Sequence, residues 1–286
     1  MNNTEKLWAA GQSVWYDNIQ RSLLRNGEMA GMIARGEIRG VTSNPSIFMN
    51  AIANSSDYDE SLKPLSDPAL SAEEVFFRLA IEDIQAAADL FLPLYQGSGG
   101  ADGYVSLEVS PFLADKSAET LAQAEALWQR VKRPNLMIKI PATKAGLPAI
   151  QAAIAKGINV NVTLIFSRER YSAVMEAYLS GLEARAEAGL PLERIASVAS
   201  FFISRVDSHI DPRLQAIGTT DALALAGQAA VANARLAYAQ FLQVFGSERF
   251  ARLKAKGARK QRPLWASTST KNPAYRDEMY EIGRAH

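Results

Sequence analysis

The chain has 286 residues with a net charge of +1, and 48% of its residues are hydrophobic and 21% charged, which is typical of a globular protein with a substantial core. The near-neutral charge gives no sign of a nucleic-acid partner, and no apolar run approaches the roughly 20 residues of a membrane span. The absence of cysteine excludes thiolate chemistry, and two histidines make a histidine-dependent triad or a multi-histidine metal site improbable.

Strand-like runs alternate with helix-like runs along the whole chain. Several strand-like runs are short and apolar on both faces, as expected for a parallel sheet that helices cover. In chain order they span residues 13–18, 38–44, 104–110, 136–142, 158–167, 195–204 and 262–268.

The helix-like runs between these strands include residues 19–36, 71–95 and 220–245. The second is strongly amphipathic, and its acidic first turn suits a helix N-terminus. One face of it carries four apolar side chains, those of Phe77, Ile81, Ile84 and Ala88.

The alternation, the number of strands and the chain length favour an α/β fold of the TIM (β/α)8-barrel type. No glycine-rich dinucleotide motif follows the first strand, which weakens the alternative of a doubly wound sheet. Only 18 residues follow Thr268, and they contain no recognisable eighth strand. We therefore expect one barrel domain over residues 1–286 that is truncated at its C-terminus. The final "GRAH" (283–286) is consistent with an added tail or a shortened reading frame.

Polar side chains interrupt the C-terminal ends of all seven predicted strands, where the active site of such a barrel lies. Each of them alone has an ordinary structural explanation, but their common placement predicts one polar site. In chain order they are Asp17; Thr42, Ser43 and Asn44; Glu108; Lys139; Asn161 and Thr163; Ser200 and Arg205; and Ser267 with Lys271.

Lys139 is the most informative of these residues because it lies within the apolar stretch "NLMIKIPAT" (135–143). Its ammonium group could reach water from a buried stem. Alternatively, a dry environment could favour the neutral amine, which attacks a carbonyl to form a Schiff base. A carboxylate must then transfer protons, and Asp17 and Glu108 are the candidates. Either could instead form an ion pair with Lys139, and Asp17 could cap a helix.

The other polar residues also allow two interpretations. Asn44 before Pro45 is typical of a helix N-cap and can also hold a substrate hydroxyl. Asn161 and Thr163 share one strand face and need polar partners. Arg205 could form a surface ion pair or bind a phosphate. The basic stretch 252–262 lacks interleaved aromatic residues, so a solvated helix end and loop is favoured over a nucleic-acid site.

Five motifs in order resemble the transaldolase family, in particular its bacterial branch that is sometimes fused to a phosphoglucose isomerase. They are "TSNPSIF", "IKIPAT", "INVNVTLIFS", "SVASFFISRVD" and "PLWASTSTKNPAY", and the resemblance extends from about residue 5 to about residue 280. Members of this branch continue past "NPAYRD" into an eighth strand and a closing helix, which this sequence lacks.

The resemblance implies a role for each candidate residue. Lys139 matches the Schiff-base lysine, Asp17 the general acid/base, and Glu108 a carboxylate that works through a water held by Thr163. The residues implied to bind the dihydroxyacetone unit are Asn44, Asn161 and Ser200, with Phe202 as a lining ring. Those implied to bind phosphate are Arg205 and, with less defined spacing, Ser267 and Lys271.

The implied reaction transfers a dihydroxyacetone unit between sugar phosphates in the non-oxidative pentose phosphate pathway. It requires neither a metal nor an organic cofactor. Two alternatives are an aldolase that releases free dihydroxyacetone and an inactive truncated chain that acts as an interaction module. We expect sugar phosphates as partners, no nucleic acid, no membrane, a cytoplasmic location, and a monomer or homodimer.

Overall fold

The computed structural model describes residues 3–65, 67 and 69–280. The chain forms two compact units, which are described separately. The first contains Met1–Leu113 and Glu119–Lys139, and the second contains Ala114–Ala118 and Ile140–His286. No helix in the described part of the chain is long and apolar enough to cross a membrane.

The strands of the first unit are parallel and pair in chain order. They are β1 (Trp15–Tyr16), β2 (Gly40–Val41), β3 (Tyr104–Glu108) and β4 (Leu136–Pro141), the last of which ends in the second unit. β1 and β2 are shorter than predicted. Backbone hydrogen bonds from Arg39 N–H to the Val14 carbonyl and from Thr42 N–H to the Tyr16 carbonyl continue their pairing at both ends.

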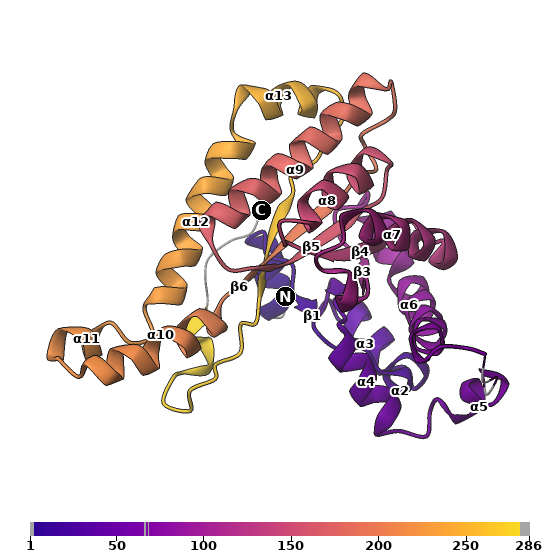
Figure 1. Cartoon of the computed structure of the whole chain (residues 1–286), viewed down its shortest axis with the longest axis horizontal. Coiled ribbons are helices and arrows are strands. Elements are labelled where there is room, and N and C mark those ends of the chain that lie inside the picture. Colours follow the sequence, from indigo (N-terminus) through magenta and orange to yellow (C-terminus); the bar gives the residue numbers. More distant parts are fainter. Residues whose placement is uncertain (1–2, 66, 68, 281–286) are drawn as a thin grey trace. The chain divides into compact units, whose positions relative to one another are not determined.

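Most helices of the first unit are short, and Figure 1 shows them in indigo and purple. The predicted helical run 19–36 is two helices, because Gly27 adopts a left-handed conformation (φ 86°) that ends the helical path. The helical elements are α1 (Asn3–Ala9), α2 (Arg21–Arg25), α3 (Glu28–Ala34), α4 (Pro45–Ala53), α5 (Asp59–Leu62), η1 (Lys63–Leu65), α6 (Ala72–Gly97), η2 (Pro111–Leu113) and α7 (Ser117–Val131).

Helix α6 forms as its sequence predicts and packs against β3. Its N-cap is Ser71, whose hydroxyl accepts a hydrogen bond from the Glu74 N–H at 3.1 Å. The four apolar side chains predicted to share a face are all buried. Val105 and Leu107 of β3 are also fully buried, so the helix-covered side of the sheet in this unit is apolar.

The strands of the second unit are β5 (Val160–Ile165), β6 (Ser197–Phe202) and β7 (Arg262–Ala266), which are again parallel and in chain order. The N–H of Ala142, directly after β4, donates to the carbonyl of Thr163 in β5. The register of β5 shifts between Val162 and Ile165, where Leu164 has a φ of 61°. This left-handed residue marks a β-bulge.

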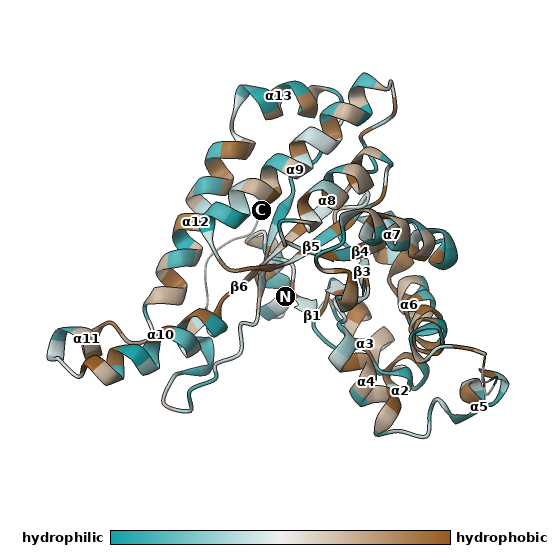
Figure 2. Cartoon of the chain, in the orientation of Figure 1, coloured by the Kyte–Doolittle hydropathy of each residue, from teal (hydrophilic) through white to brown (hydrophobic). Residues whose placement is uncertain are grey.

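Helices α8, α9 and α12 run alongside the strands of the second unit in Figure 1. The predicted helical run 220–245 is interrupted at Gly227, which has a φ of 75°. In Figure 2, α12 carries both brown and teal patches along its length, as expected for a helix with one buried face. The helical elements are α8 (Gly146–Ala155), α9 (Arg168–Glu187), α10 (Ser204–Ile217), α11 (Thr220–Ala224), α12 (Ala229–Phe245), α13 (Glu248–Ala255) and η3 (Asp277–Tyr280).

The sequence from Thr268 to Tyr280 contains no strand, only the short η3. Two tyrosines fix this segment to α10: the Tyr275 hydroxyl donates to Asp211 at 2.6 Å, and the Tyr280 hydroxyl donates to Asp207 at 3.1 Å. The described residues therefore contain seven parallel strands with intervening helices, which confirms the α/β-barrel class and the lack of an eighth strand within them. The terminal "GRAH" lies outside the described residues.

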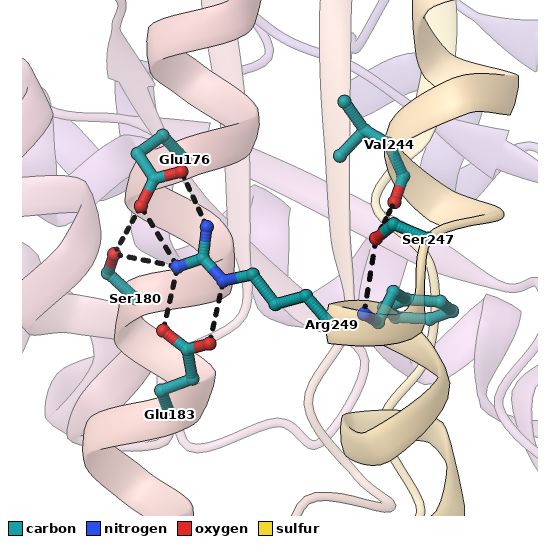
Figure 3. A network of polar contacts seen from close by, with 7 residues as sticks. Glu176, Ser180, Glu183, Val244, Ser247 and Arg249 are labelled. Carbon is teal, nitrogen blue, oxygen red and sulfur yellow. Dashed lines mark hydrogen bonds and ion pairs between the residues drawn. The ribbon is translucent and has the colours of Figure 1, made fainter.

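Arg249 joins α13 to α9 through the polar network of Figure 3. Its guanidinium group contacts the carboxylates of Glu176 and Glu183 at 2.6 and 2.7 Å. Ser247 caps α13 by accepting a hydrogen bond from the Phe250 N–H. Hydrogen bonds from Arg249 lower the pKa of both glutamates, so the network favours their ionised forms.

Arg249→Met is expected to lower the free energy of unfolding by about 1 kcal/mol and the melting temperature by about 2–4 °C near pH 7, since the network is partly exposed and screened. A depressed carboxyl pKa contributes stability above the unfolded value, which is lost as the pH falls through the folded one. The difference from wild type should therefore shrink below pH 4.5, the ordinary glutamate value. Thermal melts between pH 3 and 8 measure it, with the exposed Lys254→Met on the same helix as control. An equal loss at all pH values would contradict the electrostatic origin.

Candidate active site

In the first unit, one face of β3 and β4 carries the candidate chemistry. Glu108 and Lys139 are direct cross-strand partners, as are Ser106 and Met137. Because side chains alternate along a strand, these four lie on one face, and Val105 and Leu107 lie on the other. Lys139 therefore lies on the face of the sheet that also carries Ser106 and Glu108, opposite the face of Val105 and Leu107.

Lys139 is buried, with 7% of its surface exposed. Its Nζ lies 3.2 Å from Glu108 Oε2 and donates a hydrogen bond to the backbone carbonyl of Ser43 at 3.0 Å. The side chain therefore stays inside the unit, contrary to the interpretation in which its head group reaches bulk water. The predicted ion pair with Glu108 forms.

Burial raises the pKa of the Glu108 carboxyl group. The positive charge of Lys139 opposes this shift, whereas the negative charge of Asp17 adds to it. A carboxyl group with a raised pKa can both take up and release a proton at a higher pH than an ordinary glutamate.

Asp17 directly follows β1, and its side chain is exposed. Its Oδ1 accepts a hydrogen bond from the Thr42 hydroxyl at 2.6 Å. It does not cap α2, whose N-cap residue is Gln20. The Thr42 bond holds the carboxylate at the C-terminal end of β1, on the side of β2.

Asn44 is the N-cap of α4, as predicted: its Oδ1 accepts a hydrogen bond from the Ile47 N–H at 3.0 Å. This bond uses the amide oxygen and leaves the amide nitrogen available as a donor. The preceding residue, Ser43, is fully buried, and its hydroxyl donates to the Ser106 carbonyl at 2.7 Å. This contact fixes the backbone carbonyl that Lys139 binds.

In the second unit, Asn161 and Ser200 form a buried pair. The Ser200 hydroxyl donates to Asn161 Oδ1 at 2.7 Å, and both side chains are at most 2% exposed. Thr163 is also buried, and its hydroxyl has no hydrogen-bond partner among the described residues. Buried hydroxyl groups usually have a partner, so Thr163 is suited to bind a polar atom of another molecule.

The residues after β6 form a mixed aromatic and basic group. The Arg205 guanidinium lies 5.1 Å from the ring centroid of Phe202 and has no acidic partner within ion-pair distance in the described residues. Among the described residues, therefore, Arg205 does not form the surface ion pair that was the predicted alternative. The Ser267 hydroxyl lies 2.9 Å from that of Ser204 at the start of α10, whereas the exposed Lys271 donates to Ser269.

Sequence reasoning assigned no role to three groups in these clusters: the Ser43 carbonyl, the Thr42 hydroxyl and the Phe166 ring. Thr42 and Ser43 were expected at a strand end. The role of the Ser43 backbone carbonyl as an acceptor could not be predicted, because a backbone carbonyl does not depend on residue type. The Phe166 ring packs against Phe202, at a centroid distance of 5.1 Å. The basic stretch 252–262 forms the exposed end of α13 and the loop before β7, as predicted.

Together the two clusters contain the groups that imine chemistry on a phosphorylated carbonyl compound needs. The first unit supplies a buried amine and two carboxylates. The second supplies hydroxyl and amide groups and an arginine that has no acidic partner in the described part of the chain and lies at a helix N-terminus, where anions bind favourably.

Comparisons with known proteins agree with this chemistry. The family model described as "Transaldolase/Fructose-6-phosphate aldolase" matches residues 14–285. The transaldolase of Mycolicibacterium smegmatis is 54% identical over 278 residues, which are 97% of this chain and 75% of that protein. The transaldolase of Thermobifida fusca is also 54% identical, over 96% of this chain and 75% of its own length, and Transaldolase 1 of Streptomyces avermitilis is 52% identical, over 98% and 74%. The chain therefore belongs to the transaldolase/fructose-6-phosphate aldolase family.

Proposed function

We propose that this protein is a transaldolase that moves a dihydroxyacetone unit from a ketose phosphate to an aldose phosphate through a Schiff base on Lys139. The donors would be fructose 6-phosphate or sedoheptulose 7-phosphate, and the acceptors erythrose 4-phosphate or glyceraldehyde 3-phosphate. The observation that carries the proposal is the buried amine of Lys139 held 3.2 Å from the Glu108 carboxylate, in a chain of this family.

Lys139 acts as the nucleophile. Its neutral amine adds to the ketose carbonyl carbon to form a carbinolamine. The hydroxyl group of this adduct leaves as water with a proton donated by Glu108, which gives a protonated imine. The imine accepts the electron pair of the adjacent C–C bond when that bond breaks, so the aldose phosphate leaves and the three-carbon unit stays on the lysine as an enamine. The enamine then attacks the acceptor aldehyde, and hydrolysis of the new imine restores the amine.

The two carboxylates divide the proton transfers. Asp17 takes the proton of the hydroxyl group that becomes the aldehyde on cleavage, a role that its exposed position allows. Glu108 assists the gain and loss of water at the imine carbon, a role that its raised pKa supports. The unpaired Thr163 hydroxyl supports its assignment as the group that holds the water.

The remaining residues bind the substrate in this proposal. Asn44, Asn161 and Ser200 hold hydroxyl groups of the dihydroxyacetone unit, and Phe202 lines the site. Arg205 binds the phosphate, which is supported by its lack of an acidic partner in the described residues and its place in the first turn of α10. Ser267 and Lys271 are weaker phosphate candidates because Ser204 and Ser269 already bond to them.

Product analysis separates this proposal from the two alternatives. With fructose 6-phosphate and erythrose 4-phosphate, a transaldolase forms sedoheptulose 7-phosphate and glyceraldehyde 3-phosphate, and it forms little free dihydroxyacetone when the acceptor is omitted. Free dihydroxyacetone as the main product in both cases would assign the aldolase reaction instead. A cooperative thermal melt without any turnover would favour the inactive interaction module.

We also propose a cytoplasmic location, a monomeric or homodimeric state, and a single barrel domain over residues 1–286.

A further inference from the structure

The β-bulge in β5 changes which side chain comes next on the strand face that carries Asn161 and Thr163. Val162 pairs with Ala199, and Ile165 pairs with Phe201, so three steps along β5 match two along β6. In a regular strand, Ile165 would come level with Phe202. The extra residue instead aligns Ile165 with Phe201, on the side where Phe201 contacts Tyr171 of α9. The ring of the next residue, Phe166, then contacts that of Phe202.

Phe166, Phe202 and Arg205 consequently form a row, which we call the Phe166 row. The Phe166 and Phe202 rings are 5.1 Å apart between centroids and inclined at 39°, and the Arg205 guanidinium lies 5.1 Å from the Phe202 centroid. Phe202, in the middle, is only 9% exposed, whereas Phe166 is 39% exposed. Phe166 therefore packs against the ring on which the arginine rests.

The backbone of Phe166 is fixed from both sides. Its carbonyl accepts a hydrogen bond from Asn233 Nδ2 of α12 at 2.9 Å. The next residue, Ser167, is the N-cap of α9 and accepts from the Arg170 N–H at 3.1 Å. The backbone at Phe166 is thus held by the bulge before it and by contacts with α12 and α9 after it.

We propose that Phe166 is a positioning residue for Arg205, acting through Phe202; the proposal rests on the proposed role of Arg205 in phosphate binding. An arginine with no acidic partner in the described residues has many side-chain conformations, and ordering it on substrate binding costs free energy. An aromatic platform reduces that cost because the planar guanidinium stacks on the ring. The Phe166 row therefore determines affinity for phosphorylated sugars rather than the chemical steps.

The test compares each phosphorylated acceptor with its unphosphorylated analogue. Phe166→Ala is expected to raise KM for glyceraldehyde 3-phosphate by about threefold, within the range of the cation–π contact between Arg205 and Phe202 that Phe166 supports, with kcat changed less than about twofold. KM for D-glyceraldehyde should not change. Phe166→Leu keeps an apolar side chain but removes the ring. Like Phe166→Ala, it should raise KM for glyceraldehyde 3-phosphate and leave KM for D-glyceraldehyde unchanged. Leu242→Ala, which removes another exposed apolar side chain of the second unit, is the matched control.

Arg205→Ala distinguishes failure of this inference from failure of the proposed phosphate role. It should raise KM for the phosphorylated acceptor at least as much as Phe166→Ala, and the double variant should be no worse than Arg205→Ala alone. If Arg205→Ala does not raise KM for the phosphorylated acceptor more than KM for the unphosphorylated one, the role of Arg205 in phosphate binding is wrong. If Arg205→Ala has that selective effect, but Phe166→Leu and Phe166→Ala change neither KM or change both equally, the positioning role of Phe166 is wrong.

Discussion

Lys139→Met is expected to abolish transfer of the dihydroxyacetone unit, with kcat reduced roughly 10⁴-fold or more, as when other covalent nucleophiles are removed. Methionine has a similar length and suits a site that is 7% exposed, so the fold should persist. It has no amine, and no imine can form. The loss is chemical and not structural, so the melting temperature should stay within a few degrees of the wild-type value.

Borohydride reduction measures directly whether an imine forms on Lys139. Wild-type protein treated with fructose 6-phosphate and borohydride should gain the mass of one reduced three-carbon adduct, located on Lys139 by peptide mapping. Lys139→Met should gain none, whereas the exposed Lys254→Met should react like the wild type. An adduct on another lysine, or turnover by Lys139→Met, would contradict the assignment.

The unusual position of Lys139 could be predicted because one charge within an apolar strand violates the ordinary pattern of burial. The strand order and the buried face of α6 could also be predicted, since both follow from regular periodicity. The contacts of Lys139 could not. Its second partner is the backbone carbonyl of Ser43, 96 positions earlier in the chain, and a carbonyl is the same for every residue type.

The position of Phe166 shows a second limit. Alternation along "INVNVTLIFS" correctly places Asn161 and Thr163 on one face, and the same rule carried further would place Ile165 beside them. The bulge at Leu164 reverses the alternation, and it depends on pairing with β6, some 35 residues away. The breaks at Gly27 and Gly227 are local, because both glycines adopt positive φ angles, but glycine within a helical pattern does not by itself require a break.

Glu108→Gln is expected to lower kcat about 10²- to 10⁴-fold, the usual contribution of a general acid/base, and to leave the adduct-forming lysine in place. Glutamine has nearly the same shape and can still accept a hydrogen bond from Lys139. The borohydride adduct should therefore form, but more slowly than in the wild type. A glutamine variant with wild-type kcat would exclude Glu108 from the proton transfers.

The pH dependence of kcat/KM gives an independent measurement of the role of Glu108. Because burial raises the pKa of Glu108, the ionised fraction falls with decreasing pH well before the ordinary value of 4.5 is reached. The acidic limb of kcat/KM in the wild type should lie above pH 4.5 and should disappear or move in Glu108→Gln. If the limb keeps its position in the variant, it belongs to another group.

The same carboxyl group links activity to stability. Its raised pKa means that the folded protein holds the proton more tightly than the unfolded chain, so its contribution to stability declines as the pH rises from 4.5 through the folded value and is constant above it. Asp17→Asn removes a like charge that helps to raise this pKa. In that variant the pKa of Glu108 should fall, and a carbon-13 carboxyl NMR titration would record the change even without turnover. An unchanged titration of Glu108 would mean that the charge of Asp17 does not contribute to the raised pKa of this carboxyl group.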